Sequence, residues 1–209
     1  MPPSPDSAAT RLDDATGVLI AGGAAVRMGG ASKGLLLVDG EPLAARTLRL
    51  FRELFEEILV VANDPAPWEG LGVRVVQDAI AGKGAPGGLH AALLNARTGW
   101  VFAAGCDMPF LTAEPIALLA AWRPGSKAVV PRWRGRLEPL HAFWSVGCLG
   151  EIERRLRAGD PSLQSLATVL GARIVDEEAW REVDPTGRAF ENANTPEDAA
   201  RLGLVLPRG

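Results

Sequence analysis

The feature that most constrains this chain is the alternation of short apolar runs with segments of helical periodicity. Apolar or β-branched runs of strand length occur at residues 18–20, 58–61, 73–76, 100–104 and 128–130. Between them, apolar residues recur at helical spacing after Glu41-Pro42 and over residues 91–94 and 116–122. Strands that alternate with helices form a mostly parallel sheet with helices on both faces. The expected fold is therefore α/β, a Rossmann-like three-layer domain.

The second half of the chain interrupts this alternation. Two extended pieces around Arg134-Gly135-Arg136, within residues 131–146, predict a small hairpin excursion. Helices are expected near residues 148–157 and 162–170, a strand at 172–175, and a last helix that begins at Thr195-Pro196 with the threonine as N-cap. No repeat or linker divides the sequence. We therefore expect a domain over residues 16–209, preceded by a disordered lead-in over residues 1–15.

Charge and composition exclude several classes of protein. The formal net charge is -3 over 209 residues, which provides no basic field for nucleic acid, and no apolar run approaches the roughly 20 residues of a membrane span. The N-terminus lacks the pattern of a signal peptide, so we expect a cytoplasmic protein with a small-molecule partner. Cys106, Cys148, His90 and His141 are isolated in the sequence, which argues against a disulfide framework or a Cys/His metal site.

Polar or glycine residues follow four of the predicted strands. The first strand leads into Ala21-Gly22-Gly23, the next into Asn63, the third into Asp78 and the fourth into Asp107. Any one of these residues is typical of a turn or a helix cap. Because the carboxyl ends of parallel strands share one edge of a sheet, where ligands bind in open α/β folds, their coincidence predicts a ligand-binding edge.

The loop after the first strand, Gly22-Gly-Ala-Ala-Val-Arg-Met-Gly-Gly-Ala-Ser-Lys-Gly34, indicates a phosphate-binding site of an uncommon kind. It is not a Walker loop, because Lys33 stands between Ser32 and Gly34, and it lacks the G-x-G-x-x-G spacing of dinucleotide oxidoreductases. Its glycines permit close backbone approach, and Arg27 and Lys33 supply two cations, which together suit a polyphosphate. The alternative, a surface turn with solvated cations, is less favoured because the loop directly follows a buried strand.

Asp107 is the candidate metal ligand. It follows an apolar strand and precedes Met108-Pro109, and a single carboxylate together with substrate phosphates is a common way to bind Mg²⁺. The alternative is a helix-capping role ahead of Phe110-Leu111-Thr112. Opposite a cationic polyphosphate loop, the metal interpretation is favoured.

These residues resemble the molybdenum cofactor guanylyltransferases, within the wider nucleotidyltransferase superfamily. The resemblance runs from about Gly17 to Leu202 and is carried by the motifs Gly22-Gly23-x-x-x-Arg27-Met28-Gly29-Gly30-x-x-Lys33, Asp39-Gly40-Glu41-Pro42-Leu43, Val61-Ala62-Asn63, Asp78, Gly105-Cys106-Asp107-Met108-Pro109 and Asn192-Ala193-Asn194-Thr195-Pro196-Glu197. It implies a magnesium-dependent transferase with GTP and molybdopterin as substrates. Transient contact with cofactor-biosynthesis proteins and molybdoenzymes is also implied.

The resemblance further implies a role for individual residues. Those expected to bind the nucleotide are Ile20, Ala21, Gly22, Lys33, Asn63, Asp78 and Asp107. Those expected to bind the pterin are Arg27, Gly88, Asn192 and Asn194, with Gly88 placed in a turn over residues 85–89. Catalysis is expected to involve Arg27, Lys33 and Asp107, with Asp107 as the Mg²⁺ ligand. The alternatives are a molybdopterin cytidylyltransferase, a sugar-phosphate nucleotidyltransferase, or a carrier that binds without turnover.

Overall fold

The computed structural model describes residues 11–21, 34, 36–159 and 162–205. The strands are β1 (Leu12–Ile20), β2 (Leu37–Val38), β3 (Glu41–Pro42), β4 (Phe55–Val61), β5 (Arg74–Val76), β6 (Trp100–Gly105), β7 (Ala128–Trp133), β8 (Arg136–Leu137), β9 (His141–Ser145) and β10 (Arg173–Val175). The α-helices are α1 (Leu43–Leu54), α2 (Gly84–Asn95), α3 (Ala113–Ala121), α4 (Leu149–Ala158), α5 (Leu163–Val169), α6 (Glu177–Arg181) and α7 (Pro196–Arg201).

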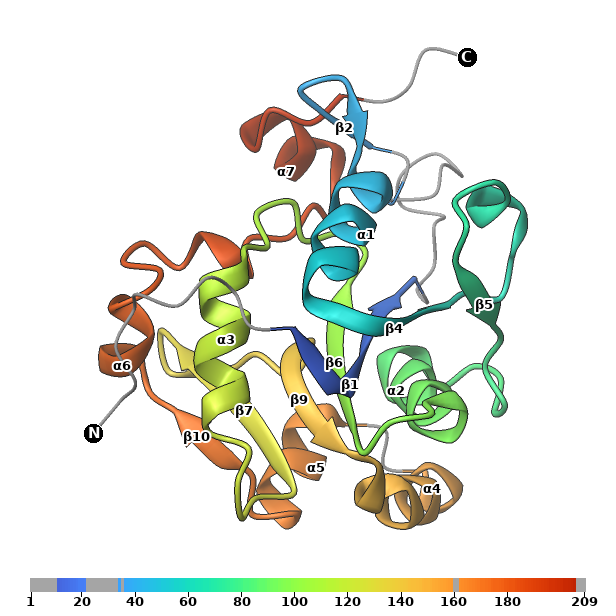
Figure 1. Ribbon diagram of the computed structural model, residues 1–209, viewed down its shortest axis with the longest axis vertical. Helices are drawn as coiled ribbons and strands as arrows, with labels where there is room; N and C mark the ends of the chain where they lie inside the picture. The colour runs from blue at the N-terminus through green and yellow to red at the C-terminus, as the bar shows by residue number, and fades with distance from the viewer. Residues whose placement is uncertain (1–10, 22–33, 35, 160–161, 206–209) are drawn as a thin grey trace.

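One large, mostly parallel sheet organises these elements, as predicted. Its strand order is β10-β7-β9-β6-β1-β4-β5, and β8 pairs with β7 (Figure 1). β1 pairs in parallel with both β4 and β6, whereas β9 inserts antiparallel between β6 and β7. The predicted hairpin is β7–β8, in which Arg134 and Gly135 both adopt positive φ at the turn. The α/β fold class is therefore confirmed.

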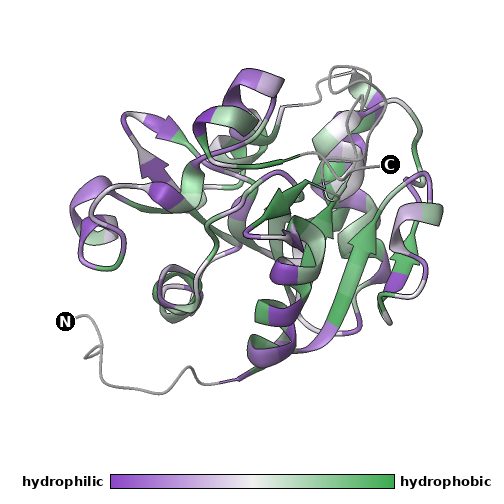
Figure 2. Ribbon diagram, turned by 90° about the horizontal axis from the view of Figure 1, so that it is seen from above, coloured by the Kyte–Doolittle hydropathy of each residue, from purple (hydrophilic) through white to green (hydrophobic). Residues whose placement is uncertain are grey.

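Helices cover both faces of the sheet because successive strand residues point to opposite sides. In β1, Leu19 belongs to one apolar cluster, together with residues of α1 and α3. Its neighbours Val18 and Ile20 belong to a second cluster, together with residues of α2, α4 and α5. The strands are accordingly apolar along their length, whereas polar residues gather on the outer sides of the helices (Figure 2). This pattern is typical of a sheet buried on both faces.

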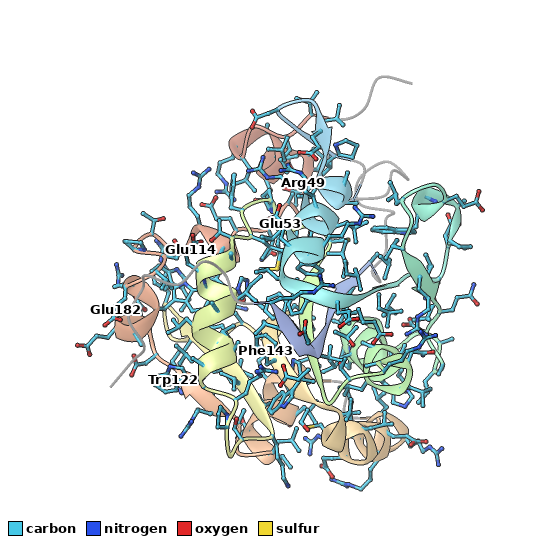
Figure 3. The ribbon with its side chains drawn as sticks, viewed as in Figure 1. Arg49, Glu53, Glu114, Trp122, Phe143 and Glu182 are labelled. Atoms are coloured by element: carbon cyan, nitrogen blue, oxygen red, sulfur yellow. The ribbon has the colours of Figure 1, made fainter. Side chains whose placement is uncertain are left out.

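The division between surface and core is visible on single elements. Arg49 and Glu53 are exposed on α1, while Phe143 is fully buried in β9 and belongs to the cluster that α3 covers (Figure 3). Burying a side chain of this size contributes about 1.5–3 kcal/mol. No helix in the described part of the chain has the length and apolar content that crossing a membrane would require.

The first strand begins earlier than predicted. β1 starts at Leu12, and Ala15 is buried beside Trp100 of β6. Residues 12–15 therefore belong to the sheet and not to a lead-in that ends at residue 15, while residues 1–10 lie outside the described part. Residues 12–15 include two exposed charged residues, Asp13 and Asp14. Because of them the stretch is not an apolar run, and the local sequence does not indicate a strand.

A small satellite unit joins the C-terminal region to the segment that precedes α1. β2 and β3 form a two-stranded sheet, and Leu37 bridges to Val205. Buried apolar side chains from this unit, from α1 and from the region of α7 form a third cluster, which contains Leu36, Val38, Leu43, Ala193, Ala199 and Leu204. The unit therefore packs the segment just before α7 against the body of the protein.

Candidate active site

Backbone hydrogen bonds continue past the carboxyl ends of β6, β1, β4 and β5 and keep these four ends aligned along one edge of the sheet. Cys106 N donates to Ile20 O at 3.1 Å, Ala21 N to Val61 O at 2.8 Å, and Ala62 N to Val76 O at 2.9 Å. The predicted backbone contacts of Ile20 and Ala21 thus lie at the middle of this edge. Gly22, Arg27 and Lys33, which carry the predicted phosphate contacts, lie outside the described residues.

Asn63 and Asp78 form a matched pair at one end of this edge. The Asn63 amide nitrogen donates to Asp78 Oδ2 at 3.0 Å, and Asp78 N donates to Asn63 Oδ1 at 3.1 Å. Among the described residues, the other carboxylate oxygen, Asp78 Oδ1, is buried without a hydrogen-bond partner. A buried acceptor left unpaired costs about 1–3 kcal/mol. The pair is thus suited to receive a donor from a bound molecule.

Asp107 lies two residues beyond β6, on the other side of β1. The absence of a side chain at Gly105 makes room for it, since a Cβ at Gly105 would lie 2.7 Å from Asp107 Oδ1. The carbonyl of Asp107 accepts from Ala193 N at 2.9 Å. The alternative role as a helix cap is not observed, because α3 begins at Ala113 and its N-cap residue is Thr112.

The segment that contains Asn192 and Asn194 is thereby attached to Asp107. Ala193 between them is fully buried, and the Asn192 amide nitrogen donates to Phe190 O at 3.0 Å. After Asn194, a capping box opens α7, in which the Thr195 side chain accepts from Asp198 N and the Asp198 side chain accepts from Thr195 N. The hydrogen bond to Asp107 on one side and the capping box on the other thus hold Asn192 and Asn194 close to Asp107.

A cleft of about 370 Å³ opens in front of Asp107. We call it the Asp107 cleft; its lining residues are Ala85, Pro86, Asp107, Met108, Glu138, Pro139, Leu140, Ser162, Leu163, Gln164, Asn192 and Asn194. The structure therefore brings together Asp107, Asn192 and Asn194, three of the predicted site residues. They come from two segments that are more than eighty residues apart in the sequence.

Gly88 occupies a different position from the predicted one. It lies inside α2 and is buried, and a Cβ there would approach Ile20 Cγ2 to 2.7 Å. Residues 84–95 form a helix and not the predicted turn. Gly88 thus lets α2 pack closely on β1, and it is Ala85 and Pro86, one turn earlier, that line the Asp107 cleft. The predicted turn is therefore wrong, Gly88 is not among the residues that line the Asp107 cleft, and its contact with the pterin stays a prediction.

Known proteins share both the sequence pattern and this fold. Residues 17–176 match the family model of the MobA-like NTP transferase domain. The probable molybdenum cofactor guanylyltransferase of Pelotomaculum thermopropionicum is 36% identical over 191 residues, which cover 91% of this chain and 93% of the relative. The molybdenum cofactor guanylyltransferase of Desulfosudis oleivorans is 30% identical and covers 95% of this chain and 98% of its own.

This chain belongs to the molybdenum cofactor guanylyltransferase family. Among solved structures, molybdopterin-guanine dinucleotide biosynthesis protein A from Archaeoglobus fulgidus superposes with a TM-score of 0.77 at 26% identity, over 90% of this chain and 96% of that one. The 2-C-methyl-D-erythritol 4-phosphate cytidylyltransferase of Thermus thermophilus superposes with a TM-score of 0.60 at 22% identity, over 88% and 95%. The fold is thus shared with a cytidylyltransferase, and the resemblance to the guanylyltransferases is confirmed by sequence.

Three polar residues of the cleft in this guanylyltransferase were not predicted, Ser162, Glu138 and Gln164. Glu138 follows β8 and Gln164 lies in the first turn of α5, and both line the Asp107 cleft. Burial raises the pKa of the Glu138 carboxyl to about 7, and attraction to Arg136 offsets only part of this. The sequence did contain a signal for Glu138: it is a carboxyl residue with apolar neighbours on both sides, at the point where the hairpin returns to the sheet.

Proposed function

We propose that this chain transfers GMP from GTP to the phosphate of molybdopterin and releases pyrophosphate. The observation that supports this most directly is the division of the sheet edge. The sheet order places the Asn63–Asp78 pair just beyond the ends of β4 and β5, on one side of β1, and Asp107 with its cleft just beyond β6, on the other. A nucleoside on the first side and an acceptor on the second would meet over the end of β1.

The reaction needs charge control more than it needs a strong base. A phosphate monoester has a second pKa near 6, so the acceptor oxygen is already anionic at neutral pH. It attacks the α-phosphorus of GTP, the bond from that phosphorus to the bridging oxygen breaks, and pyrophosphate leaves with the bonding electrons. Bringing two polyanions together is the main cost, and the cations Arg27 and Lys33 of the glycine-rich loop are the residues we assign to offset it.

The donor set around Asp107 suits Mg²⁺. A carboxylate is a hard oxygen ligand, and Mg²⁺ commonly binds through one or two carboxylates while substrate phosphates and water complete its octahedron. Within the described ranges, no group of three or more His, Cys, Asp or Glu side chains is placed to hold a metal alone, which suits an ion that arrives with its nucleotide. When bound, Mg²⁺ would neutralise charge on the phosphate oxygens.

The residues of the chain would divide the remaining work. Asp78 Oδ1, buried and unpaired among the described residues, would accept a hydrogen bond from the nucleoside, while Asn63 holds Asp78 in place. Asn192 and Asn194 would bind the acceptor within the Asp107 cleft. The hydrogen bond from Ala193 N to Asp107 O would keep these asparagines at a constant position relative to the metal ligand.

Nucleotide choice under turnover tests the proposal. Pyrophosphate release should require molybdopterin and should be much faster with GTP than with CTP or UTP at equal concentration. Asp107→Asn preserves the size of the side chain and should lower turnover by at least 100-fold while the melting temperature stays within a few degrees. Preference for CTP would contradict guanylyl transfer, and an active Asp107→Asn variant would contradict the metal role.

A carrier that binds both molecules without reaction is the alternative from another class. It predicts binding of GTP and molybdopterin without release of pyrophosphate. The same assay separates the two, because a carrier would show saturable binding by calorimetry and no product at any time. A chain that uses its binding free energy only for holding ligands would have no need of a metal ligand next to the leaving group.

A further inference from the structure

The Asp107 cleft contains a second carboxyl group, that of Glu138, to which the proposed reaction assigns no part. Its backbone is held from both sides: Glu138 N donates to Pro131 O at 3.0 Å, and His141 N donates to Glu138 O at 3.1 Å. These bonds tie it to β7 and to the start of β9, two strands of the main sheet. The backbone of Glu138 is therefore held by the sheet, and its side chain lines the Asp107 cleft.

The chain itself supplies little compensation for burying this carboxyl. Glu138 is half-buried, and its pKa is raised by loss of hydration, with Arg136 acting only through longer-range attraction. Within the described part of the molecule, no side chain or backbone group makes a hydrogen bond or ion pair with its carboxylate. A carboxylate placed out of water without donors is unfavourable. A ligand that brings N–H groups into the cleft would remove this cost.

The charge of the acceptor determines which of its ends can face Glu138. A carboxylate repels a phosphate, and the phosphate must in any case lie at Asp107, where the reaction takes place. The other end of molybdopterin is a pterin whose pyrimidine ring carries a ring N–H beside an exocyclic amino group. Two adjacent N–H donors match the two oxygens of one carboxylate. The amide groups of Gln164, Asn192 and Asn194 on the same cleft can satisfy the remaining polar atoms.

We propose that Glu138 is a specificity-determining residue that accepts two hydrogen bonds from the amino and ring N–H groups of the pterin. This inference rests on the proposed function, because it takes the Asp107 cleft to be the acceptor site. It adds the orientation of the acceptor, with phosphate at Asp107 and pyrimidine edge at Glu138. It also gives a reason for a carboxyl at this position, since an amide or an alcohol has a single acceptor oxygen and cannot offer a separate oxygen to each of two parallel N–H donors.

The test changes the hydrogen-bonding pattern of the side chain at position 138 and, separately, that of the ligand. Glu138→Gln keeps the volume of the side chain but replaces one acceptor oxygen by an NH₂ donor. Lumazine, the 2,4-dioxo analogue of pterin, likewise replaces the 2-amino donor by an acceptor oxygen. Dissociation constants for pterin and lumazine, measured by competition against molybdopterin binding, should favour pterin at least tenfold in the natural protein. In Glu138→Gln the preference should be lost or reversed, because only lumazine then matches the side chain.

Two control variants separate recognition from damage to the fold. Glu182→Gln makes the same chemical change at an exposed glutamate (Figure 3) and should leave both dissociation constants unchanged. Glu138→Met removes hydrogen bonding at similar volume, so it should weaken pterin binding and bring the ratio of the two constants near one. GTP affinity should stay within twofold of the natural value in all three variants.

The outcomes distinguish this inference from the proposed function. Absence of the guanine dinucleotide product from the natural protein with GTP, Mg²⁺ and molybdopterin would overturn the proposed function. Normal turnover, combined with a Glu138→Gln variant that retains the natural pterin preference, would overturn the assignment of Glu138 alone. A variant whose preference shifts toward lumazine while its GTP affinity and melting temperature are retained would support it.

Discussion

Replacing His141 by Phe should remove a large part of the acid sensitivity of the folded protein. His141 is fully buried at the start of β9. Its ring lies edge-on to three aromatic rings, with centroid distances of 5.3 Å to Phe102, 5.2 Å to Trp180 and 5.5 Å to Phe190. A neutral imidazole packs well in such a cluster, whereas an imidazolium there would lose its hydration.

The size of the effect follows from the two pKa values of this side chain. Burial lowers the pKa of His141 to about 3 in the folded state, while an unfolded chain gives about 6.5. Because the folded pKa is the lower one, the unfolded state takes up the proton first, and stability falls as pH decreases from about 6.5 toward 3. Between pH 7 and pH 5 the loss amounts to about 2 kcal/mol, at about 1.4 kcal/mol per pH unit below the unfolded pKa.

Urea denaturation followed by tryptophan fluorescence at pH 7, 6 and 5 measures this contribution. The change in unfolding free energy between pH 7 and 5 should be about 2 kcal/mol smaller in His141→Phe than in the natural protein. The comparison cancels the contribution of groups common to both proteins, including His90, the only other histidine. Parallel pH profiles, within about 0.5 kcal/mol of each other, would refute the argument that burial keeps this histidine neutral.

Two glycine positions provide further tests. Gly88→Ala should lower the unfolding free energy by about 1–3 kcal/mol through overpacking against β1, whereas Gly150→Ala, in a helix with open space around the new Cβ, should be neutral or slightly stabilising in the same urea assay. Gly105→Ala should reduce turnover at least tenfold because its Cβ would displace the Asp107 carboxylate, and Gly99→Ala, just before the same strand and without close neighbours, should not. Equal effects within either pair would contradict the packing argument.

The local sequence determined the central strands and the polar residues at their ends. β-branched and apolar runs such as Ile58–Val61 favour strands wherever the chain buries them, and the capping box from Thr195 to Asp198 begins a helix through contacts four residues apart or less. Since parallel strands align their carboxyl ends, the polar residues Asn63, Asp78 and Asp107 could be assigned to one edge in advance. These predictions depend only on neighbours in the sequence and on general rules of sheet geometry.

Only the tertiary structure decided which distant segments meet. The insertion of β9 antiparallel between β6 and β7 pairs it with β6, some forty residues earlier in the chain, and with β7, some fifteen residues earlier. Nothing in residues 141–145 themselves selects those partners. The same insertion places Glu138 in the Asp107 cleft. The packing of α2 on β1 brings Gly88 into close contact with Ile20. Residues with similar secondary-structure propensity can lie in a turn, at a contact between helix and strand, or in a binding site. The free energy that decides among these positions comes from contacts between segments far apart in the chain.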